Sequence, residues 1–202
     1  MPSRAAPPTA PGSADPPEGD WSTRHSVLST ARRTAALVNV LSGGPPGPGS
    51  APEPDAVADV LRAYGESGPV ALTSTDVDGM RAAAVLLREV FAADSADAAA
   101  HVLNRLLEAH TGALRLTSHK GGTPWHPHLD GGDDAPWPEW FLASSCMALA
   151  VLVWDRQRPP GRCCASGACR NVFISQGSGP ERRYCSRRCA TRERVAAHRR
   201  RG

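Results

Sequence analysis

Four cysteines near the C-terminus stand in two close pairs, Cys164 with Cys169 and Cys185 with Cys189. Four residues separate the first two, three separate the second two, and 15 lie between the pairs. Zinc prefers four tetrahedral ligands of the thiolate or imidazole type, and short spacings let one turn present two of them to the same ion. The pattern predicts one Zn²⁺ bound by these four cysteines. It also indicates a reducing, intracellular compartment rather than a disulfide framework.

The segments around these pairs predict the order of a treble-clef zinc finger. "RNVFIS" (170–175) and "ERRYCS" (181–186) are expected to pair as a hairpin across the turn residues of "QGSGP". The following "RRCATRERVAAHRRR" holds neither glycine nor proline and predicts a helix with Cys189 in its first turn. So small a module has little core of its own, and zinc is expected to be its main source of folding free energy.

Charge is divided unequally along the chain. Residues 1–155 hold 10 basic and 18 acidic side chains, whereas residues 156–202 hold 13 arginines and two glutamates. The resulting charges of −8 and +11 make up the formal +3 of the whole chain. The basic end predicts a polyanionic partner, although a basic segment that only improves solubility is the simpler alternative. The zinc site in the same segment favours DNA as the partner.

Basic residues of the expected C-terminal helix fall in two rows. At about 100° per residue, Arg188, Arg192 and Arg199 lie within about 40° of one another, and further basic residues lie on an adjoining face. One row is expected to enter a groove of the duplex while the other contacts phosphates. The residues predicted to contact DNA are Arg182, Arg183, Arg187, Arg188, Arg192, Arg194, His198, Arg199 and Arg200.

Upstream of the finger, the spacing of apolar residues predicts a mainly α domain with one small β-hairpin. The hairpin is expected in "ALRLTSHKGGTPWHPHL", on either side of the Gly-Gly turn. The small treble-clef-like finger (α+β) follows. The predicted division is a disordered tail at 1–20, a helical domain at 21–157 and the zinc finger at 158–202. Helices are expected over residues 24–41, 55–64, 75–93, 95–111 and 136–154.

Capping residues set the expected starts of several helices. Thr75 is a suitable N-cap with Asp78 three residues later, and Ser95 is expected to cap the next helix. Pro136 or Pro138 is expected to open the last and most apolar helix of this domain.

Other polar residues of the helical domain are interpreted without a ligand. His126 and His128 in "WHPHL" have no evident carboxylate or thiol partner, so surface or turn positions are favoured over a metal site. "DGGDD" (130–134) lacks the ligand order of a calcium loop and is expected to be a solvated turn. Cys146 is interpreted as a small buried hydrophobe. No catalytic motif stands out, and the protein is not expected to be an enzyme.

The apolar segments give no indication of a membrane protein. The longest apolar run, Trp140 to Trp154, is shorter than the roughly 20 residues that a bilayer span needs, and is expected to be a buried helix. The N-terminal residues have no apolar region of the secretory type. A cytoplasmic location, at the nucleoid, is therefore predicted.

The segment "CASGACRNVFISQGSGPERRYCSRRCATRERVAAHRRR" resembles the CGNR-type zinc finger. The helical part is similar to the ABATE domain that precedes this finger, in "ALVNVLSG", "LTSTDVDGMRAAAVLLREVF" and "LNRLLEA". Members of this family are described as stress-induced transcription regulators. The resemblance implies DNA binding by the finger and a sensing or assembly role for the helical domain.

The finger departs from the motif that names the family, because "CATR" (189–192) stands where CGNR is expected. The cysteine and the arginine are kept, so the resemblance still implies zinc binding. The family's first cysteine pair has four intervening residues, which matches Cys164 with Cys169. Cys163 then has no place in the family's cysteine pattern. Cys163 is interpreted as a bystander whose side chain points away. A second hypothesis is that Cys163 exchanges with Cys164 upon oxidation.

Together these features predict a zinc-dependent, DNA-binding transcription regulator with one Zn²⁺. A zinc-stabilised module for protein interaction stays open as an alternative, as does RNA binding, although only Phe173 and Tyr184 are aromatic in the basic segment. A treble-clef nuclease ranks last, since His198, Glu181 and Glu193 alone could serve a second metal. The sequence leaves open a small-molecule or protein effector at the helical domain, the DNA target and the oligomeric state.

Overall fold

Six helices and two short hairpins make up the described part of the computed structural model, which covers residues 23–42, 54–66, 69–175 and 181–200. This architecture confirms the predicted fold class. The tail at 1–20 and the turn "QGSGP" lie outside the described residues, and the domain limits stay predictions. In chain order the elements are α1 (Thr23–Leu41), α2 (Pro54–Ala63), α3 (Ser74–Ala92), α4 (Ala96–His110), β1 (Arg115–Thr117), β2 (His126–His128), α5 (Trp137–Arg156), β3 (Gly161–Cys163), β4 (Val172–Ile174) and α6 (Arg187–Arg199).

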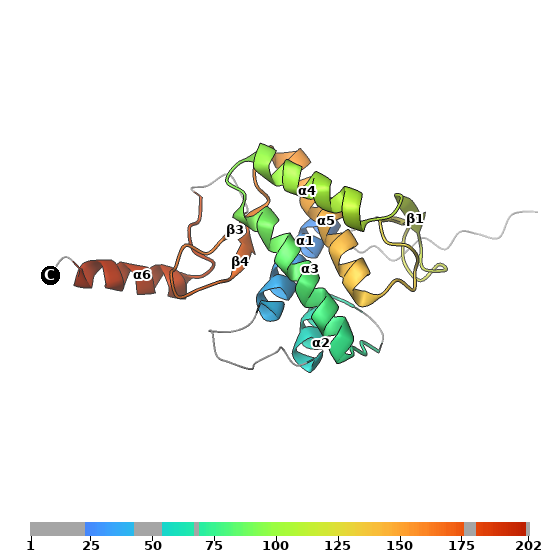
Figure 1. Ribbon diagram of the computed structural model, residues 1–202, viewed down its shortest axis with the longest axis horizontal. Coiled ribbons are helices and arrows are strands. Elements are labelled where there is room, and N and C mark those ends of the chain that lie inside the picture. Colours follow the sequence, from blue (N-terminus) through green and yellow to red (C-terminus); the bar gives the residue numbers. More distant parts are fainter. Residues whose placement is uncertain (1–22, 43–53, 67–68, 176–180, 201–202) are drawn as a thin grey trace, which may run out of the picture.

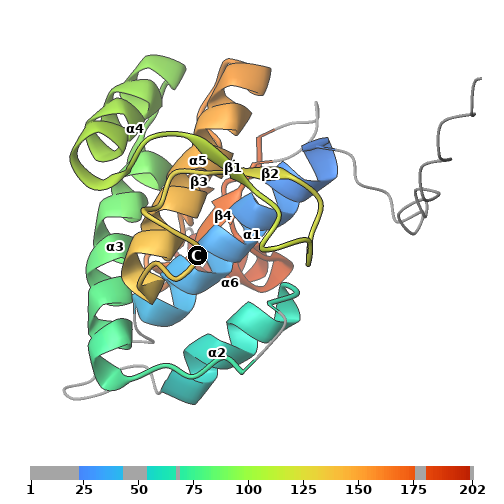
Figure 2. The ribbon, with the colours of Figure 1, turned by 90° about the vertical axis from the view of Figure 1, so that its right-hand side faces the viewer.

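Helices α1 to α5 form the helical body, and α5 is its central element. It packs against α1, α3 and α4 (Figure 2). A helix that is apolar on all sides is stable in water only when other elements surround it. The eight buried residues of α5 accordingly lie on more than one face: Phe141, Leu142, Ala143, Ser145, Cys146, Ala148, Leu149 and Leu152.

The length of α5 corrects one expectation. The apolar run was expected to be too short for a membrane span, but the helix has 20 residues and by length and composition alone could cross a bilayer. It is longer than the run because Trp137 to Glu139 and the polar pair Asp155 and Arg156 also adopt helical geometry. In the structure α5 is a core helix of the helical body.

Helix capping agrees with the sequence at two helices and differs at a third. Ser95 caps α4 by accepting a hydrogen bond from the backbone N–H of Ala98, and Pro136 precedes the first turn of α5, as predicted. At α3, however, the N-cap is Thr73 and not Thr75. Thr73 and Asp76 form a reciprocal capping box, which satisfies two backbone donors and starts the helix at Ser74.

The first hairpin has the predicted location. β1 and β2 are antiparallel, with Thr117 opposite His126. In the loop between them His119, Lys120 and Gly121 have positive φ angles, which turn the chain sharply. The loop thereby brings the imidazole of His119 back toward those of β2, where the ring centroids of His119 and His126 are 5.0 Å apart.

The second hairpin differs from the prediction. β4 pairs with β3, Cys163 standing opposite Val172, and not with residues 181–186, which form no strand. The reason is local, because the turn between Cys164 and Cys169 reverses the chain and the N–H of Cys164 donates to the carbonyl of Asn171 at 2.8 Å. Residues 181–186 contribute one backbone bond to this turn, from the N–H of Ala165 to the carbonyl of Arg183.

The β3–β4 hairpin is built into the core of the helical body. Val172 and Ile174 are buried together with residues of α1 and α3. A Cβ atom on Gly161 would lie 2.4 Å from the carbonyl oxygen of Phe173 and 2.7 Å from the ring of Phe91, so only glycine allows this approach of β3 to α3. Beyond the hairpin, α6 extends away from the rest of the molecule (Figure 1).

Candidate metal centre

The four predicted cysteines converge at the base of α6. One sulfur atom from each lies within 4.8 Å of the other three, and we call this group the cysteine cluster. The Sγ of Cys185 is 3.7 Å from that of Cys169 and 3.7 Å from that of Cys189. Four sulfurs placed tetrahedrally about zinc at about 2.3 Å are about 3.8 Å apart, so the spacing fits this ion. The distances are far longer than a disulfide bond, and all six cysteines are free.

The turn after β3 presents the first two sulfurs. Its closing bonds run from the N–H of Cys164 to Asn171, and from the N–H of Cys169 to the carbonyl of Ser166 at 2.8 Å. The N–H of Cys185 also points at the Sγ of Cys164, at 3.4 Å. Backbone N–H groups that point at sulfur are suited to thiolate ligands, whose negative charge accepts such bonds.

The start of α6 presents the other two sulfurs. Ser186 is the N-cap and accepts the N–H of Cys189 at 3.3 Å, which places Cys189 in the first turn as predicted. The buried hydroxyl of Ser166 donates to Glu193 of α6 at 2.7 Å, so the turn and the helix are also joined beyond the sulfurs. Arg192 donates to the Sγ of Cys189 at 3.3 Å.

The thiols of the cysteine cluster differ in acidity. Hydrogen bonding from Ser186 lowers the pKa of Cys189 to about 7, while burial raises the pKa of Cys185 to about 12 and raises that of Cys169 as well. Zinc ligands must be thiolates, and a divalent cation among four sulfurs supplies the positive charge that stabilises them. The chemistry of these donors therefore suits Zn²⁺.

The comparisons with known proteins cover both parts of the chain. The sequence model of the ABATE family, described as "Putative stress-induced transcription regulator", matches residues 31–156, more than half of the chain. The CGNR zinc finger model matches residues 161–202. The chain belongs to the ABATE family. No curated protein matches it.

Two further cysteines lie outside the cysteine cluster. In the ABATE domain, Cys146 is fully buried in α5, as predicted, and burial raises its pKa to about 12. Cys163 ends β3 and packs against the core of the ABATE domain, which agrees with its interpretation as a bystander. Its neighbour Cys164 alternates to the opposite side of the chain and faces the other three sulfurs.

All nine residues predicted to contact DNA are solvent-exposed in the CGNR finger. Seven of them lie on or directly after α6, and the other two have aromatic neighbours. The guanidinium of Arg182 lies over the ring of Phe173 at 5.3 Å, and that of Arg183 lies 5.9 Å from the ring of Tyr184. Arg182 also donates to the carbonyl of Cys185 at 2.9 Å, so its side chain helps to hold the backbone of the finger.

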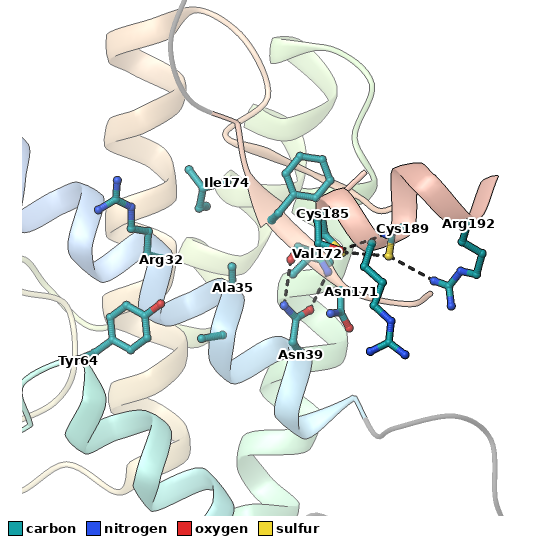
Figure 3. Close-up of a pocket in the computed structure, with 14 residues that line it drawn as sticks. Arg32, Ala35, Asn39, Tyr64, Asn171, Val172, Ile174, Cys185, Cys189 and Arg192 are labelled. Carbon is teal, nitrogen blue, oxygen red and sulfur yellow. Dashed lines mark hydrogen bonds between the residues drawn. The ribbon is translucent and has the colours of Figure 1, made fainter. Parts of the chain in front are cut away.

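A groove of about 530 Å³ separates α1 of the ABATE domain from the CGNR finger (Figure 3). Sequence reasoning did not find it, because its walls come from four segments distant in the chain. Arginines stand on both sides, Arg32 on α1 and Arg188 and Arg192 on α6. At its floor Asn39 of α1 bonds to the backbone of Val172. The groove therefore adjoins both the cysteine cluster and the hydrogen bonds between Asn39 and Val172, which join the ABATE domain to the CGNR finger.

Two expectations about the first hairpin were wrong at one residue each. His128 is 8% exposed and Asp130 is 3% exposed, so neither is a surface or solvated turn residue. They are partners, since Nδ1 of His128 lies 2.8 Å from Oδ2 of Asp130. Burial lowers the pKa of His128, against the opposing effect of Asp130. The carboxylate partner of His128 could not be predicted from the sequence, because Asp130 is held inward by its ion pair with Arg115 on the facing strand.

Proposed function

We propose that this protein is a zinc-dependent, DNA-binding transcription regulator. In this proposal one Zn²⁺ in the cysteine cluster fixes the base of α6, and the exposed arginines of α6 dock on DNA. The observation that carries the proposal is the position of these arginines. They lie along the exposed surface of a helix that is anchored at the cysteine cluster and otherwise extends into solvent (Figure 1).

The charge of α6 supports a polyanionic partner. The helix carries five arginines and a single acidic residue, Glu193, and that carboxylate is already bonded to Ser166. Arginine binds phosphates through two parallel N–H groups and reads guanine in the major groove in the same way. We infer that Arg188, Arg192 and Arg199 form one contacting row, with Arg187 and Arg194 beside it.

The ABATE domain is proposed to sense an effector or to mediate assembly. Support comes from its direct contact with the finger, since Asn39 bonds to Val172 and the groove between α1 and α6 has walls from both parts. A ligand in this groove would contact arginines of both. The proposal assigns no enzymatic activity to the protein and places it in the cytoplasm, at the nucleoid.

The experiment that tests the function is a selection of genomic DNA fragments on the full-length protein. It is run with zinc-loaded protein, after chelation, and at two salt concentrations. A shared sequence motif that is lost on chelation supports the proposal. Affinity should also fall steeply with salt, because each phosphate contact releases bound counterions.

Other outcomes would favour the remaining readings. Enrichment of fragments without a motif would indicate nonspecific binding, and preferential capture of RNA in a parallel selection would indicate an RNA-binding finger. No enrichment at either salt concentration, with zinc present and the finger folded, would contradict DNA binding and favour a finger for protein interaction.

A further inference from the structure

Three imidazoles meet at the first hairpin, at the end of the molecule away from α6 (Figure 1). They belong to His119, in the loop, and to His126 and His128, on β2. We call them the histidine cluster. The Nε2 atom of His126 is 3.2 Å from that of His119 and 3.0 Å from that of His128. A nitrogen of each ring lies within 4.8 Å of the other two.

In two of the three rings the second nitrogen has a hydrogen-bonding partner that fixes the orientation of the ring. Nδ1 of His126 lies 2.8 Å from the carbonyl oxygen of Pro124, and Nδ1 of His128 lies 2.8 Å from a carboxylate oxygen of Asp130. Nδ1 of His119 faces Asp133 at 3.7 Å. Carbonyl and carboxylate oxygens only accept hydrogen bonds, so the proton of His126 and that of His128 sit on Nδ1.

These tautomers leave an electrostatic problem at the centre of the cluster. A neutral imidazole with its proton on Nδ1 has an unshared electron pair on Nε2. The Nε2 atoms of His126 and His128 therefore point electron pairs at each other across 3.0 Å. Without a positive charge between them this arrangement is repulsive. A cation bound by the three nitrogens turns the repulsion into coordination.

The carboxylates behind the rings are themselves held in place. Arg115 donates to Asp130 at 2.6 Å and to Asp133 at 2.8 Å, and the hydroxyl of Thr117 donates to Asp133 at 3.0 Å. Metal-binding histidines typically donate their other N–H to a carboxylate or a backbone carbonyl, which fixes the tautomer and makes the ligand more basic. The hairpin supplies both kinds of partner.

We propose that His119, His126 and His128 form a second metal site, which binds one divalent transition-metal ion of the zinc type through its three Nε2 atoms. Zinc–nitrogen bonds of about 2.0–2.1 Å place tetrahedral ligands about 3.3 Å apart, close to the two Nε2 distances found here. Imidazole ligands select zinc, copper, iron or nickel over magnesium and calcium.

The site has an open coordination position. Among the described residues the cluster has three ligand groups and no fourth, because both nearby carboxylates are engaged by Arg115. The side chain of His119 is 36% exposed, so this side of the cluster meets solvent. The fourth ligand is therefore water or a small donor molecule from solution. This site is independent of the DNA-binding proposal, since none of its residues belongs to the CGNR finger.

The test is a metal titration of full-length, tag-free protein that has first been stripped of metal. Zinc bound per chain is measured by mass spectrometry of the intact protein, and Co²⁺ is used as a spectroscopic probe. We expect two ions per chain. One Co²⁺ should show thiolate-to-metal charge transfer from the cysteine cluster, and the other should show only the weaker bands of nitrogen and oxygen ligands.

Two variants assign the second ion. His119→Ala removes a ligand whose side chain is 36% exposed and leaves the buried pair of His128 and Asp130 in place, so the fold should be kept. Zinc affinity of the second site should fall more than about 100-fold, because loss of an outer partner alone costs 10–100-fold. His126→Ala should have the same effect, and His101→Ala, an exposed histidine of α4, is the matched control.

The outcomes are distinct. Loss of the nitrogen-bound ion in both cluster variants, with retention in His101→Ala, supports the site. A wild-type protein that binds a single, thiolate-ligated ion overturns it, whatever the variants do. So does a second ion that survives in His119→Ala and His126→Ala. DNA binding is not needed for any of these results.

Discussion

Asn39 of α1 uses its side-chain amide to bond both backbone groups of Val172 in β4. Its Nδ2 donates to the carbonyl oxygen at 3.0 Å, and its Oδ1 accepts from the N–H at 2.7 Å (Figure 3). Val172 is 1% exposed, so water cannot readily replace these bonds. The pair joins the ABATE domain to the hairpin whose turn carries Cys164 and Cys169.

Asn39→Ala is therefore expected to destabilise the protein. It leaves the donor and the acceptor of Val172 without partners, at a cost of about 1–3 kcal/mol in the free energy of unfolding. Asn104→Ala, at an exposed position of α4, is the matched control. Urea unfolding of zinc-loaded protein checks the difference. Equal unfolding midpoints for the two variants would show that the hydrogen bonds between Asn39 and Val172 contribute nothing to stability.

Removal of zinc is expected to release the finger and spare the helical body. The turn after β3 and the first turn of α6 meet at the sulfurs, whereas α5 is held by apolar packing. Hydrogen exchange followed by mass spectrometry should show protection lost over Arg187–Arg199 after chelation and kept over Trp137–Arg156. Unchanged protection of α6 in metal-free protein would contradict a structural role for the ion.

The two adjacent cysteines are expected to differ in their effect on zinc. Cys164→Ser removes a ligand and should abolish tight binding at the cysteine cluster, while Cys163→Ser should keep one thiolate-bound ion. The charge-transfer absorption of Co²⁺-loaded protein distinguishes the variants. The reverse result would assign Cys163 to the site. Equal, intermediate losses would support the hypothesis that the two cysteines exchange.

Arg188→Ala is expected to weaken DNA binding. If Arg188 contacts a phosphate, affinity falls for all sequences and the slope of log affinity against log salt drops by about 1. If it reads a base, about 1–3 kcal/mol of discrimination is lost at one position. Arg105→Ala, on α4, is the control, because it also removes one exposed arginine. Binding isotherms measured at several salt concentrations distinguish a phosphate contact from a base contact. Equal affinities for the two variants would exclude Arg188 from the interface.

The capping box of α3 predicts a pH-dependent contribution to stability. Thr73→Ala should cost about 1 kcal/mol, whereas Thr75→Ala should cost much less. Hydrogen bonds from Thr73 lower the pKa of Asp76 in the folded state. The stabilisation by Asp76 is therefore complete above its unfolded pKa of about 3.9 and is lost as the pH falls through the lower folded value.

Unfolding of wild type and Asp76→Ala should be compared between pH 7 and pH 3, with chelator present in every sample. The difference in unfolding free energy should shrink toward the acid end. A difference that is constant over this range would mean that the carboxylate charge makes no contribution. The comparison is made between two proteins without zinc, so proton competition for the cysteines does not enter it.

Local spacing was enough to predict most of the helices, the first hairpin and one cluster of side chains. The helices α1 and α4 and the first hairpin follow from short-range periodicity and turn residues. The four cysteines could be assigned together because close pairs converge on one ion wherever the chain brings the pairs together. The basic character of α6 is likewise a property of a single segment and needs no tertiary contact to be recognised.

Tertiary structure decided the features that depend on contacts across the chain. β4 pairs with β3 because the turn at Cys164 folds back, and both strands then join the core of the helical body. From the sequence, each histidine and each aspartate of the first hairpin could only be interpreted separately. Only the folded hairpin places Arg115 against Asp130 and His128 against His126, because the ring positions depend on strand register and loop conformation rather than on spacing.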